Sequence, residues 1–434
     1  MKYYLAIDIG ASSGRHIIGY KENGELKTVE VYRFPNGVKE YNGRLIWDID
    51  SLFQNVLEGI KKALLLYPNI ESMSVDTWGV DYVLLNGDKE ILPCYAYRDN
   101  RTKDSIPNVH SIINFERLYE ITGSQFQEFN TIYQLYKDKM DGRLVNATDF
   151  LLIPEYLMYK LTGRKVHEYT NASTTGMLDA KTNTHSEEII EKLDLPKNLF
   201  TKLTKSSESL GYFKEEIQKM VGGNIKVKLC PTHDTASAVE GIPMEENAPY
   251  ISSGTWSLLG IKVPKGITNK QAMVANYSNE YGPNYIRFQK NIMGLWIIQN
   301  LSKELNLDFA KMVEMGRKSN YEHLFDVNDA CFLSSLDMKN EIISWYKRKG
   351  LNPPETDSDL INATYLSLAD SYRVAINELE SITNTKYSHL YIVGGGAKNK
   401  YLNELTEKFT NHKVIALPIE ATAIGNLLSQ MEVE

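Results

Sequence analysis

The strongest indication of the fold class is residues 3–32, YYLAIDIGASSGRHIIGYKENGELKTVEVY. An apolar run predicts a strand that ends at Asp8-Ile9-Gly10, and the small residues 11–14 then predict a turn. Asn23-Gly24 is typical of a two-residue hairpin turn, and residues 29–32 alternate in polarity as a half-buried strand does. This stretch therefore predicts three consecutive strands joined by tight turns.

A helix and a further strand are predicted next. Residues 52–64 carry apolar side chains at helical spacing, and Asp50 or Ser51 is expected to cap this helix. A strand is expected to reach Asp76-Thr77-Trp78-Gly79, and Asn86-Gly87 predicts another hairpin. Antiparallel strands followed by a helix and a strand indicate a mixed α/β layer.

The second half of the chain begins with a similar pattern. Residues 250–261, YISSGTWSLLGI, predict strand, turn and strand, and Ser-Ser-Gly occurs both here and at 12–14. A long helix is predicted over 359–382, then a strand at 389–393, three glycines, and a helix from about Tyr401. The repeated tripeptide is a weak indication of duplication.

Length predicts two or three domains, because the chain has 434 residues and a typical domain has roughly 150. Together with the repeated pattern, it indicates two similar domains. We expect an N-terminal domain at 1–243 and a C-terminal domain at 244–434, with the boundary near Gly241–Pro249.

Composition excludes several classes of protein. The chain has 48 Lys and Arg against 55 Asp and Glu, a net charge of −7, which argues against a nucleic-acid or anionic-membrane binder. Hydrophobic content of 42% and charged content of 24% are typical of globular proteins. No stretch approaches the ~20 apolar residues of a membrane span, and no signal peptide is recognised, so we expect a soluble cytoplasmic protein. Three scattered cysteines predict neither disulfides nor a zinc site.

The first candidate site is DIGASSGR at residues 8–15. A turn of small residues exposes backbone N–H groups and hydroxyls that can bind phosphates. Asp8, at the end of the strand, could hold a hydrated Mg²⁺ beside those phosphates. A tight hairpin with a structural Asp is an equally good interpretation of the pattern.

The second candidate site is PTHDTASA at residues 231–238. Asp234 could act as a general base toward a hydroxyl, because phosphoryl transfer requires an oriented nucleophile more than an early deprotonated one. From the residues alone, an N-capping role for Asp234 is the better interpretation. His233 is expected to be a hydrogen-bonded structural histidine, since no second His or Cys lies at metal-ligand spacing.

Two further segments could contact ligands. Residues 392–399, IVGGGAKN, place three glycines after a strand, which lets the backbone lie flat against a planar or phosphorylated ligand. The alternative is a simple flexible turn, which three consecutive glycines directly after a strand disfavour. Residues 76–82 and 97–101 combine carboxylates, amides and aromatic rings that suit a sugar. They could equally be half-buried packing and a surface ion-pair cluster.

In this order, the segments resemble the FGGY carbohydrate kinases of the actin, hexokinase and Hsp70 superfamily. DIGASSGR resembles the family's first phosphate segment and HDTASA the segment with its catalytic base. ISSGTWSLLG resembles the start of the second domain, and IVGGGAKN the adenosine segment. DTWGVDYVLL, YRDNRT and NIMGLWIIQ resemble, within the family, the kinases of L-rhamnulose. The resemblance extends over residues 4–428.

The resemblance implies an α/β fold of two actin-like (RNase H-like) ATPase domains, with mixed sheets flanked by helices and an interdomain active-site cleft. It implies that Asp234 is the proton acceptor and that Asp8 orients Mg²⁺. The sugar contacts implied are Gly79, His233, Asp234, Thr235 and Asn291. The ATP contacts implied are Ala11, Ser12, Ser13, Gly14, Arg15, Thr255, Gln299 and Gly395.

The reaction implied is transfer of the γ-phosphoryl group of ATP to the 1-hydroxyl of L-rhamnulose. The partners are therefore a small ketose and ATP, with no nucleic acid and no membrane; the oligomeric state is not predicted. The alternatives are another ketose such as L-fuculose, or a non-catalytic, actin-like protein that uses ATP to switch shape. Family members usually continue for some tens of residues after a segment like Glu420–Asn426, so the closing helical segment is expected to be short.

Overall fold

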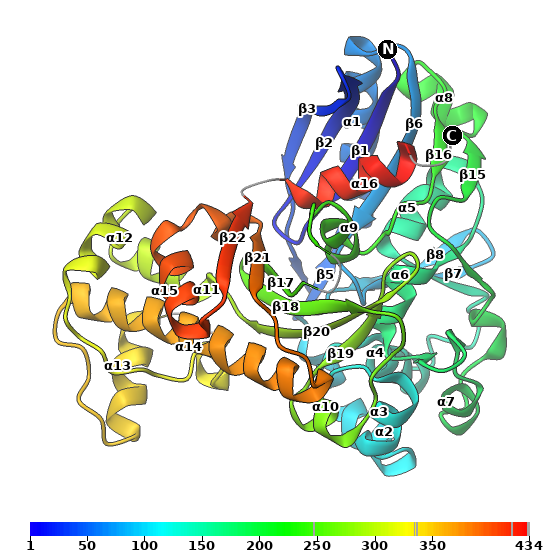
Figure 1. Cartoon of the computed structure of the whole chain (residues 1–434). Coiled ribbons are helices and arrows are strands. Elements are labelled where there is room, and N and C mark those ends of the chain that lie inside the picture. The colour runs from blue at the N-terminus through cyan, green and yellow to red at the C-terminus, as the bar shows by residue number, and fades with distance from the viewer. Residues whose placement is uncertain (246–247, 334, 336, 418–419, 432–434) are drawn as a thin grey trace. The chain divides into compact units, whose positions relative to one another are not determined.

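The computed structural model describes residues 1–245, 248–333, 335, 337–417 and 420–431. They form two compact units, and Figure 1 labels their helices and strands. The first unit contains residues 1–243, 263–287 and the described residues from Glu420 onward; the second contains the described residues of 244–262 and 288–419. The units follow packing rather than continuous sequence, so the domain limits 1–243 and 244–434 stay a prediction.

The first unit is built on a six-stranded mixed sheet. Its order is β15 (Ser209–Tyr212), β16 (Lys226–Lys228), β6 (Ile70–Thr77), β1 (Tyr3–Ile9), β2 (Ser13–Glu22) and β3 (Glu25–Pro35). Strand β2 runs antiparallel to both of its neighbours, β1 and β3, whereas β1 and β6 are parallel. The strands predicted from residues 3–32 and from the segment ending at Gly79 are therefore confirmed.

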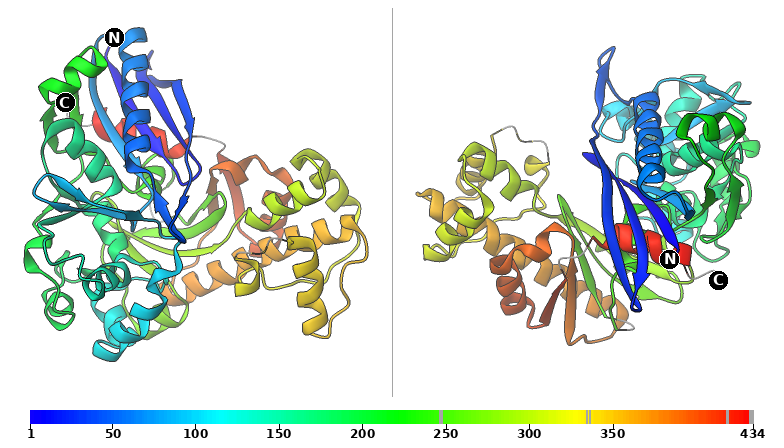
Figure 2. Two further views of the ribbon diagram at one scale, coloured as in Figure 1. Left: turned by 180° about the vertical axis from the view of Figure 1, so that it is seen from behind. Right: turned by 90° about the horizontal axis from the view of Figure 1, so that it is seen from above.

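Two helices cover opposite faces of β1. Leu5 and Ile7 pack with α1 (Ile49–Leu66), while Tyr4 and Ala6 pack with Leu427 of α16 (Ala421–Met431). Successive strand residues point to opposite faces of a sheet, so this alternation places one helix on each side. Figure 2 shows α1 in front of the sheet when it is seen from behind, and Figure 1 shows α16 on the other side.

The helix predicted over 52–64 is α1, but its predicted cap is wrong. Asp48 is the N-cap, and its side chain accepts a hydrogen bond from the backbone N–H of Ser51 at 2.9 Å. Asp48, Asp50 and Ser51 all suit a cap chemically, and the backbone path selects the first of them.

Smaller elements complete the first unit. Two three-stranded sheets have the orders β10-β7-β8 and β4-β5-β9, and two-stranded pairs form between β11 and β14 and between β12 and β13. The strands are β4 (Lys39–Tyr41), β5 (Arg44–Trp47), β7 (Tyr82–Asn86), β8 (Lys89–Ile91), β9 (Cys94–Tyr95), β10 (Asp149–Leu152), β11 (His167–Glu168), β12 (Leu178–Asp179), β13 (Thr184–His185), β14 (Leu203–Thr204) and β19 (Ser278–Tyr281). The helices are η1 (Asn100–Asp104), α2 (Ser105–Ile112), α3 (Phe115–Thr122), α4 (Thr131–Met140), α5 (Ile153–Thr162), α6 (Tyr169–Ala172), η2 (Ser173–Thr175), α7 (Glu187–Lys192), η3 (Lys197–Leu199), α8 (Glu215–Val221), α9 (Asp234–Glu240) and α10 (Lys270–Val274).

The second unit also contains a mixed sheet. The strands β20 (Ile286–Met293), β18 (Trp256–Val263), β17 (Tyr250–Ser253), β21 (His389–Val393) and β22 (Lys413–Leu417) are neighbours in that order. Its helices are α11 (Trp296–Glu304), α12 (Phe309–Lys318), η4 (Ala330–Phe332), α13 (Met338–Arg348), α14 (Asp357–Thr383), η5 (Gly395–Lys398) and α15 (Lys400–Thr410). The strand–turn–strand, long helix, strand and final helix predicted here are present as β17, β18, α14, β21 and α15.

Among the described residues, no helix has the length and apolar character needed to span a membrane. Cys94 and Cys230 are buried and Cys331 is half-buried, and all three are free.

Candidate functional site

The carboxyl ends of β1 and β6 bring three acidic residues together. Asp8 on β1 pairs in register with Asp76 on β6. One residue further on, Thr77 forms a parallel bridge with His233, which directly precedes Asp234. The charge of Asp234 acts on both Asp8 and Asp76 and raises their pKa values, after the larger effect of burial. Asp8 and Asp234, which more than two hundred residues separate in the sequence, thus lie at the same end of the sheet.

Arg15 supplies positive charge at this end of the sheet. Asp8 and Arg15 face each other across β1 and β2, and the guanidinium donates from Nη2 to Asp8 Oδ2 at 2.5 Å. Its Nη1 donates to Glu420, which precedes α16. Arg15 thus pairs with two carboxylates, while Asp76 and Asp234 add two more acidic side chains nearby, and such an excess of acidic groups favours a bound cation.

Asp76 is a fully buried carboxylate of this group. Its Oδ2 accepts a hydrogen bond from Asn426 Nδ2 at 2.6 Å, whereas its Oδ1 has no partner among the described residues. Burial and then the charge of Asp8 raise the pKa of Asp76 well above the usual range. An acceptor that is buried without a donor is costly, so it points to a group that completes the site.

Asp234 is the first residue of α9, and its two oxygens differ. Oδ1 accepts from the backbone N–H of Thr235 at 2.5 Å and from its hydroxyl at 3.1 Å. Oδ2 accepts no hydrogen bond from the described residues, and the side chain is 30% exposed. The N-cap of α9 is His233 rather than Asp234. One oxygen of Asp234 is therefore held while the other can accept a proton.

The backbone before Asp234 is anchored by Glu168, a buried residue. Its Oε2 accepts hydrogen bonds from Thr170, Asn171 and Thr232 at 2.6–3.2 Å. Thr232 in turn accepts from the backbone N–H of Thr77 at 2.9 Å. These bonds fix residues 232–234 against the end of β6.

Gly79 and Val80 form a strained turn beside this anchor. A Cβ on Gly79 would lie 2.7 Å from Thr174 Oγ1, so only glycine fits. Val80 has a φ of 67°, which is unfavourable for a β-branched residue. The turn is held by Thr174, whose hydroxyl accepts from the Val80 N–H at 3.0 Å, and by Thr131, whose hydroxyl donates to the Val80 carbonyl at 2.7 Å. Backbone strain that neighbours hold in place is frequent at ligand sites.

Asp81 holds two tryptophan side chains next to this turn. Its Oδ2 accepts from the indole N–H groups of Trp47 at 2.6 Å and Trp78 at 3.0 Å, whose rings lie 4.2 Å apart. Burial raises the pKa of Asp81 to about 6. Arg101 is buried and pairs with Asp138 at 2.6 Å, so this part of residues 97–101 is not a surface ion-pair cluster.

The predicted phosphate segment is a hairpin turn between β1 and β2. The Gly10 N–H donates to the Ser13 carbonyl at 2.9 Å, and Ser12 is exposed at the tip. Ala11 and Ser13 are half-buried beside it. Gly14 lies in β2, where a Cβ would meet the Phe34 ring at 2.1 Å, so packing within the sheet already requires this glycine.

Helix α16 contacts both Asp76 and helix α9. Asn426 holds Asp76, and its Oδ1 accepts from Gln430 Nε2 at 2.7 Å. A Cβ on Gly425 would lie 1.8 Å from the carbonyl oxygen of Ser237, in α9. This close approach fixes the helix that begins with Asp234.

The second unit contains the remaining predicted site residues. Thr255, in the β17–β18 turn, donates from its hydroxyl to Gln299 Oε1 at 3.4 Å. Gly395 is exposed in η5, and a Cβ there would meet no atom within 4 Å. Asn291 lies in β20. The structure thus brings together Thr255 and Gln299, while Asn291 and Gly395 come from other segments of this unit.

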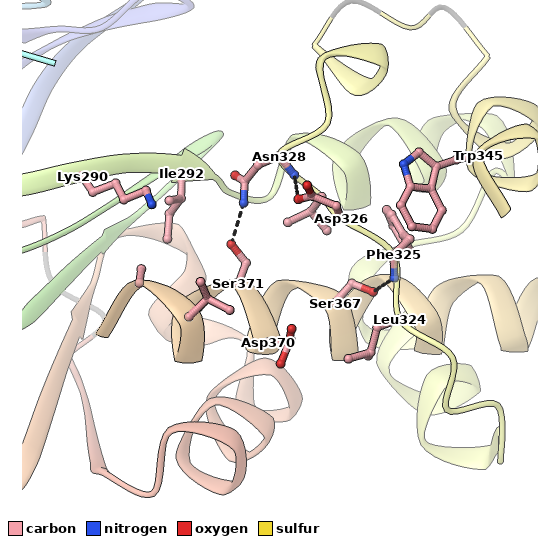
Figure 3. Close-up of a pocket in the computed structure, with 13 residues that line it drawn as sticks. Lys290, Ile292, Leu324, Phe325, Asp326, Asn328, Trp345, Ser367, Asp370 and Ser371 are labelled. Carbon is pink, nitrogen blue, oxygen red and sulfur yellow. Dashed lines mark hydrogen bonds between the residues drawn. The ribbon is translucent and has the colours of Figure 1, made fainter. Parts of the chain in front are cut away.

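A separate pocket of 340 Å³ lies in the second unit (Figure 3). Lys290 and Ile292 line it from β20, and α14 forms another wall. Side chains alternate along a strand, so the intervening Asn291 is expected on the opposite face. Two polar side chains that line the pocket bond to each other, Asn328 Nδ2 donating to Ser371 Oγ at 2.9 Å. None of the predicted site residues lines this pocket.

Sequence reasoning missed several residues of the site in the first unit. Glu168 and Asn426 were not assigned a role, and Asp76 was only one of several possible sugar contacts. Each of these residues acts through partners far along the chain; Asp76 and its partner Asn426, for example, lie 350 positions apart. The signal in the sequence was the proximity of Asp76 to Gly79.

Models of one protein family match most of this chain. The N-terminal domain of the FGGY family of carbohydrate kinases matches residues 3–241, and its C-terminal domain matches residues 249–432. The chain therefore belongs to the FGGY family of carbohydrate kinases. The predicted family and the predicted α/β fold of two domains with mixed sheets are confirmed.

Individual relatives agree with this. A protein named rhamnulokinase from Oceanobacillus iheyensis is 42% identical, covering 98% of this chain and 92% of the relative. Rhamnulokinase from Bacillus subtilis is 40% identical, with 99% and 90% covered. Among solved structures, a xylulose kinase from Lactobacillus acidophilus has a TM-score of 0.83 at 17% identity, with 100% and 89% covered. Plasmodium falciparum glycerol kinase with ADP has a TM-score of 0.78 at 15% identity, with 99% and 89% covered.

Proposed function

We propose that the chain transfers the γ-phosphoryl group of ATP to the 1-hydroxyl of L-rhamnulose, giving L-rhamnulose 1-phosphate and ADP. The observation that carries the proposal is Asp234, whose Oδ1 is held by Thr235 while its Oδ2 is open, at the end of the sheet that also carries Asp8. The choice of sugar is supported by full-length relatives named rhamnulokinase in several bacteria at 36–42% identity.

In the proposed reaction, the 1-hydroxyl oxygen attacks the γ-phosphorus in line with the leaving oxygen. The new O–P bond forms as the bond between the γ-phosphorus and the β,γ-bridging oxygen breaks, and the electron pair of that bond leaves with ADP. Asp234 Oδ2 accepts the hydroxyl proton. A weakly basic carboxylate suffices, because the loose transition state needs an oriented nucleophile more than early deprotonation.

The sugar is proposed to contact the residues around this base. His233 and Thr235 flank Asp234, and the strained turn at Gly79 and Val80 offers backbone groups for hydroxyls. Asn291 is assigned to the sugar by the family resemblance. The proposed ATP contacts are Ala11, Ser12, Ser13, Gly14, Arg15, Thr255, Gln299 and Gly395.

Magnesium is proposed as the cation that accompanies ATP. Asp8 Oδ2 binds Arg15, and the buried Asp76 Oδ1 has no hydrogen-bond partner among the described residues. The described residues include no group of three or more His, Cys, Asp or Glu side chains arranged to hold a metal directly. Mg²⁺ usually keeps several waters and uses one or two carboxylates plus substrate phosphates, so this donor set fits it. When bound, it would neutralise charge on the phosphates.

The decisive experiment measures ADP release over a panel of ketoses, with the phosphorylated product identified by ³¹P NMR. L-rhamnulose should give the highest kcat/KM and a 1-phosphate. A clear preference for L-fuculose or another ketose would overturn the choice of sugar but keep the class of reaction. ATP hydrolysis that no sugar stimulates would instead favour a nucleotide-dependent switch. The cytoplasmic location expected from the sequence stays a prediction.

A further inference from the structure

Behind the proposed base, His233 lies against the buried Arg287 and the half-buried Glu280, two charged residues to which the family resemblance assigns no role. His233 Nδ1 lies 3.2 Å from Arg287 Nη2 and 3.2 Å from Glu280 Oε2. Arg287 Nη2 also lies 3.2 Å from that same Glu280 oxygen. On the other side of the ring, His233 Nε2 lies 3.4 Å from Asp234 Oδ1.

Arg287 is unusually constrained. Its side chain is fully buried, although a guanidinium is always charged in proteins. Its Nε donates to the Tyr281 carbonyl at 3.3 Å, while Nη1 has no partner among the described residues. A charge kept inside the protein with an unsatisfied donor carries a substantial free-energy cost. Such a cost is commonly retained where the group serves a site.

We propose that Arg287 is a positioning residue that holds His233 in the tautomer with the proton on Nε2, so that the ring donates to Asp234 Oδ1. This inference rests on the proposed function of Asp234. Arg287 can only donate hydrogen bonds, so His233 Nδ1 must accept. An ionised Asp234 can only accept, so His233 Nε2 must donate. The negative charge of Glu280 is then balanced by Arg287, so Glu280 needs no hydrogen bond from the His233 ring.

The alternative tautomer satisfies fewer groups. A proton on Nδ1 would bond to Glu280, but it would also face the N–H groups of Arg287. The lone pair of Nε2 would then face the lone pairs of Asp234. The Nε2–Asp234 separation of 3.4 Å is long for a hydrogen bond, and catalytic hydrogen bonds commonly shorten when substrate binds.

The consequence for the reaction is that Oδ1 of Asp234 has a third donor besides the two of Thr235. Three donors on Oδ1 fix the plane of the carboxylate, which directs Oδ2 at the sugar hydroxyl. Small errors of orientation at a reacting group can cost roughly 10²-fold in rate.

The direct test is ¹⁵N NMR of the full chain with ring-labelled histidines. Eight histidines are present, and a His233→Gln variant assigns the signals of interest. We expect His233 to have a protonated Nε2 and an unprotonated Nδ1. A ring protonated on Nδ1, alone or together with Nε2, would overturn the proposal. This measurement needs no turnover, so it stands even if the proposed reaction is wrong.

Variants separate positioning from simple support of the fold. Arg287→Met should shift His233 toward the Nδ1–H tautomer and lower kcat by roughly 10²-fold, with the ketose KM changed little. Arg287→Lys, which keeps a donor and a charge, should restore the tautomer and part of kcat. Equal losses in both variants, with an unchanged tautomer, would reject the role of Arg287.

Glu280→Met distinguishes the two tautomers when a variant of Arg287 does not fold. The thioether removes the carboxylate acceptor but leaves Arg287 in place, so the proposal expects the Nε2–H tautomer to persist. If Nδ1–H were bonded to Glu280 in the native protein, this substitution would remove its acceptor and change the ring signals, and the proposal would be wrong.

Discussion

At the scale of single residues, the site depends on which hydrogen bonds each carboxylate oxygen accepts. Asp234 and Asp76 each have one oxygen held by a donor and one without a partner among the described residues. Asp8 shares Arg15 with Glu420. A residue's neighbours, rather than its type, therefore distinguish Asp234, the proposed proton acceptor, from a structural acid such as Asp81, which accepts on both oxygens.

Asp8→Ala tests the proposed magnesium role. Removing this carboxylate should raise the Mg²⁺ concentration needed for half-maximal activity, because the phosphates lose their protein-held cation site. The ketose KM should change little. Titration of ADP binding against Mg²⁺ by calorimetry measures the effect without turnover. Glu420→Ala, which removes the other partner of Arg15, is the control, and an Mg²⁺ dependence unchanged by Asp8→Ala would reject the role.

Gly395→Ala tests the proposed nucleotide contact. A Cβ at position 395 meets no protein atom within 4 Å, so the free energy of unfolding should change by less than about 0.5 kcal/mol. If ATP lies against this backbone, its KM should nevertheless rise several-fold. Gly37→Ala, at another glycine whose Cβ would meet nothing within 4 Å, is the matched control and should alter neither quantity. An unchanged KM for ATP in Gly395→Ala would remove residue 395 from the site.

At the scale of elements, periodicity predicted the structure well. Strands β1 to β3, helix α1 and the long helix α14 follow from runs that are regular over many residues. The cap of α1 could not be chosen, because three suitable residues stand within four positions and local backbone geometry decides between them. The hydrogen bonds from Thr232 to Glu168 could not be predicted either, since no local sequence pattern links two positions that lie 64 residues apart.

The crossing of α9 and α16 can be tested at Gly425. Alanine normally favours a helix, but here its Cβ would lie 1.8 Å from the Ser237 carbonyl oxygen. We expect Gly425→Ala to lower the free energy of unfolding by about 1–3 kcal/mol and to lower kcat, because α9 begins with Asp234. Chemical denaturation measures the first effect.

Gly316→Ala, in α12, is the control for this prediction. Its nearest new contact is the Tyr401 ring at 3.3 Å, so stability should change by no more than about 1 kcal/mol. Equal stability of the two alanine variants would contradict the importance of the α9–α16 contact.

At the scale of the whole molecule, local patterns could not reveal which segments pack together. Residues 263–287 and 420–431 belong to the first unit, although they follow the start of the second in sequence. Both bring residues to the site, namely Arg287 from the first segment and Asn426 from the second. The two segments with Asp8 and Asp234 could be proposed as site segments from the sequence because each is contiguous, whereas the residues that hold them in place could not.

The buried His167 and its half-buried neighbour His185 predict how stability depends on pH. His167 and His185 lie with their rings 5.8 Å apart, and burial lowers their pKa values from 6.5 to about 4 and about 3. The unfolded chain therefore binds more protons below pH 6.5, and stability is lost as pH falls from there toward those values. At pH 5, each histidine should cost about 2 kcal/mol relative to neutral pH.

His185→Phe isolates this contribution. The new ring would lie beside Phe200, and the loss of stability between pH 7 and pH 5 should be smaller than in the native chain by about 2 kcal/mol. Urea unfolding at the two pH values measures it. Replacement of the exposed His323 by Gln is the control. A native-like pH dependence in His185→Phe would show that this histidine pair is not responsible.

The most direct test of the whole account is the turnover of L-rhamnulose by Asp234→Asn, with ketose binding measured in parallel by calorimetry. An amide of the same shape cannot take up the hydroxyl proton, so kcat should fall by about 10²- to 10⁴-fold while the affinity for the ketose stays within a few-fold. Turnover close to that of the native chain would contradict Asp234 as the base, and with it the proposed mechanism.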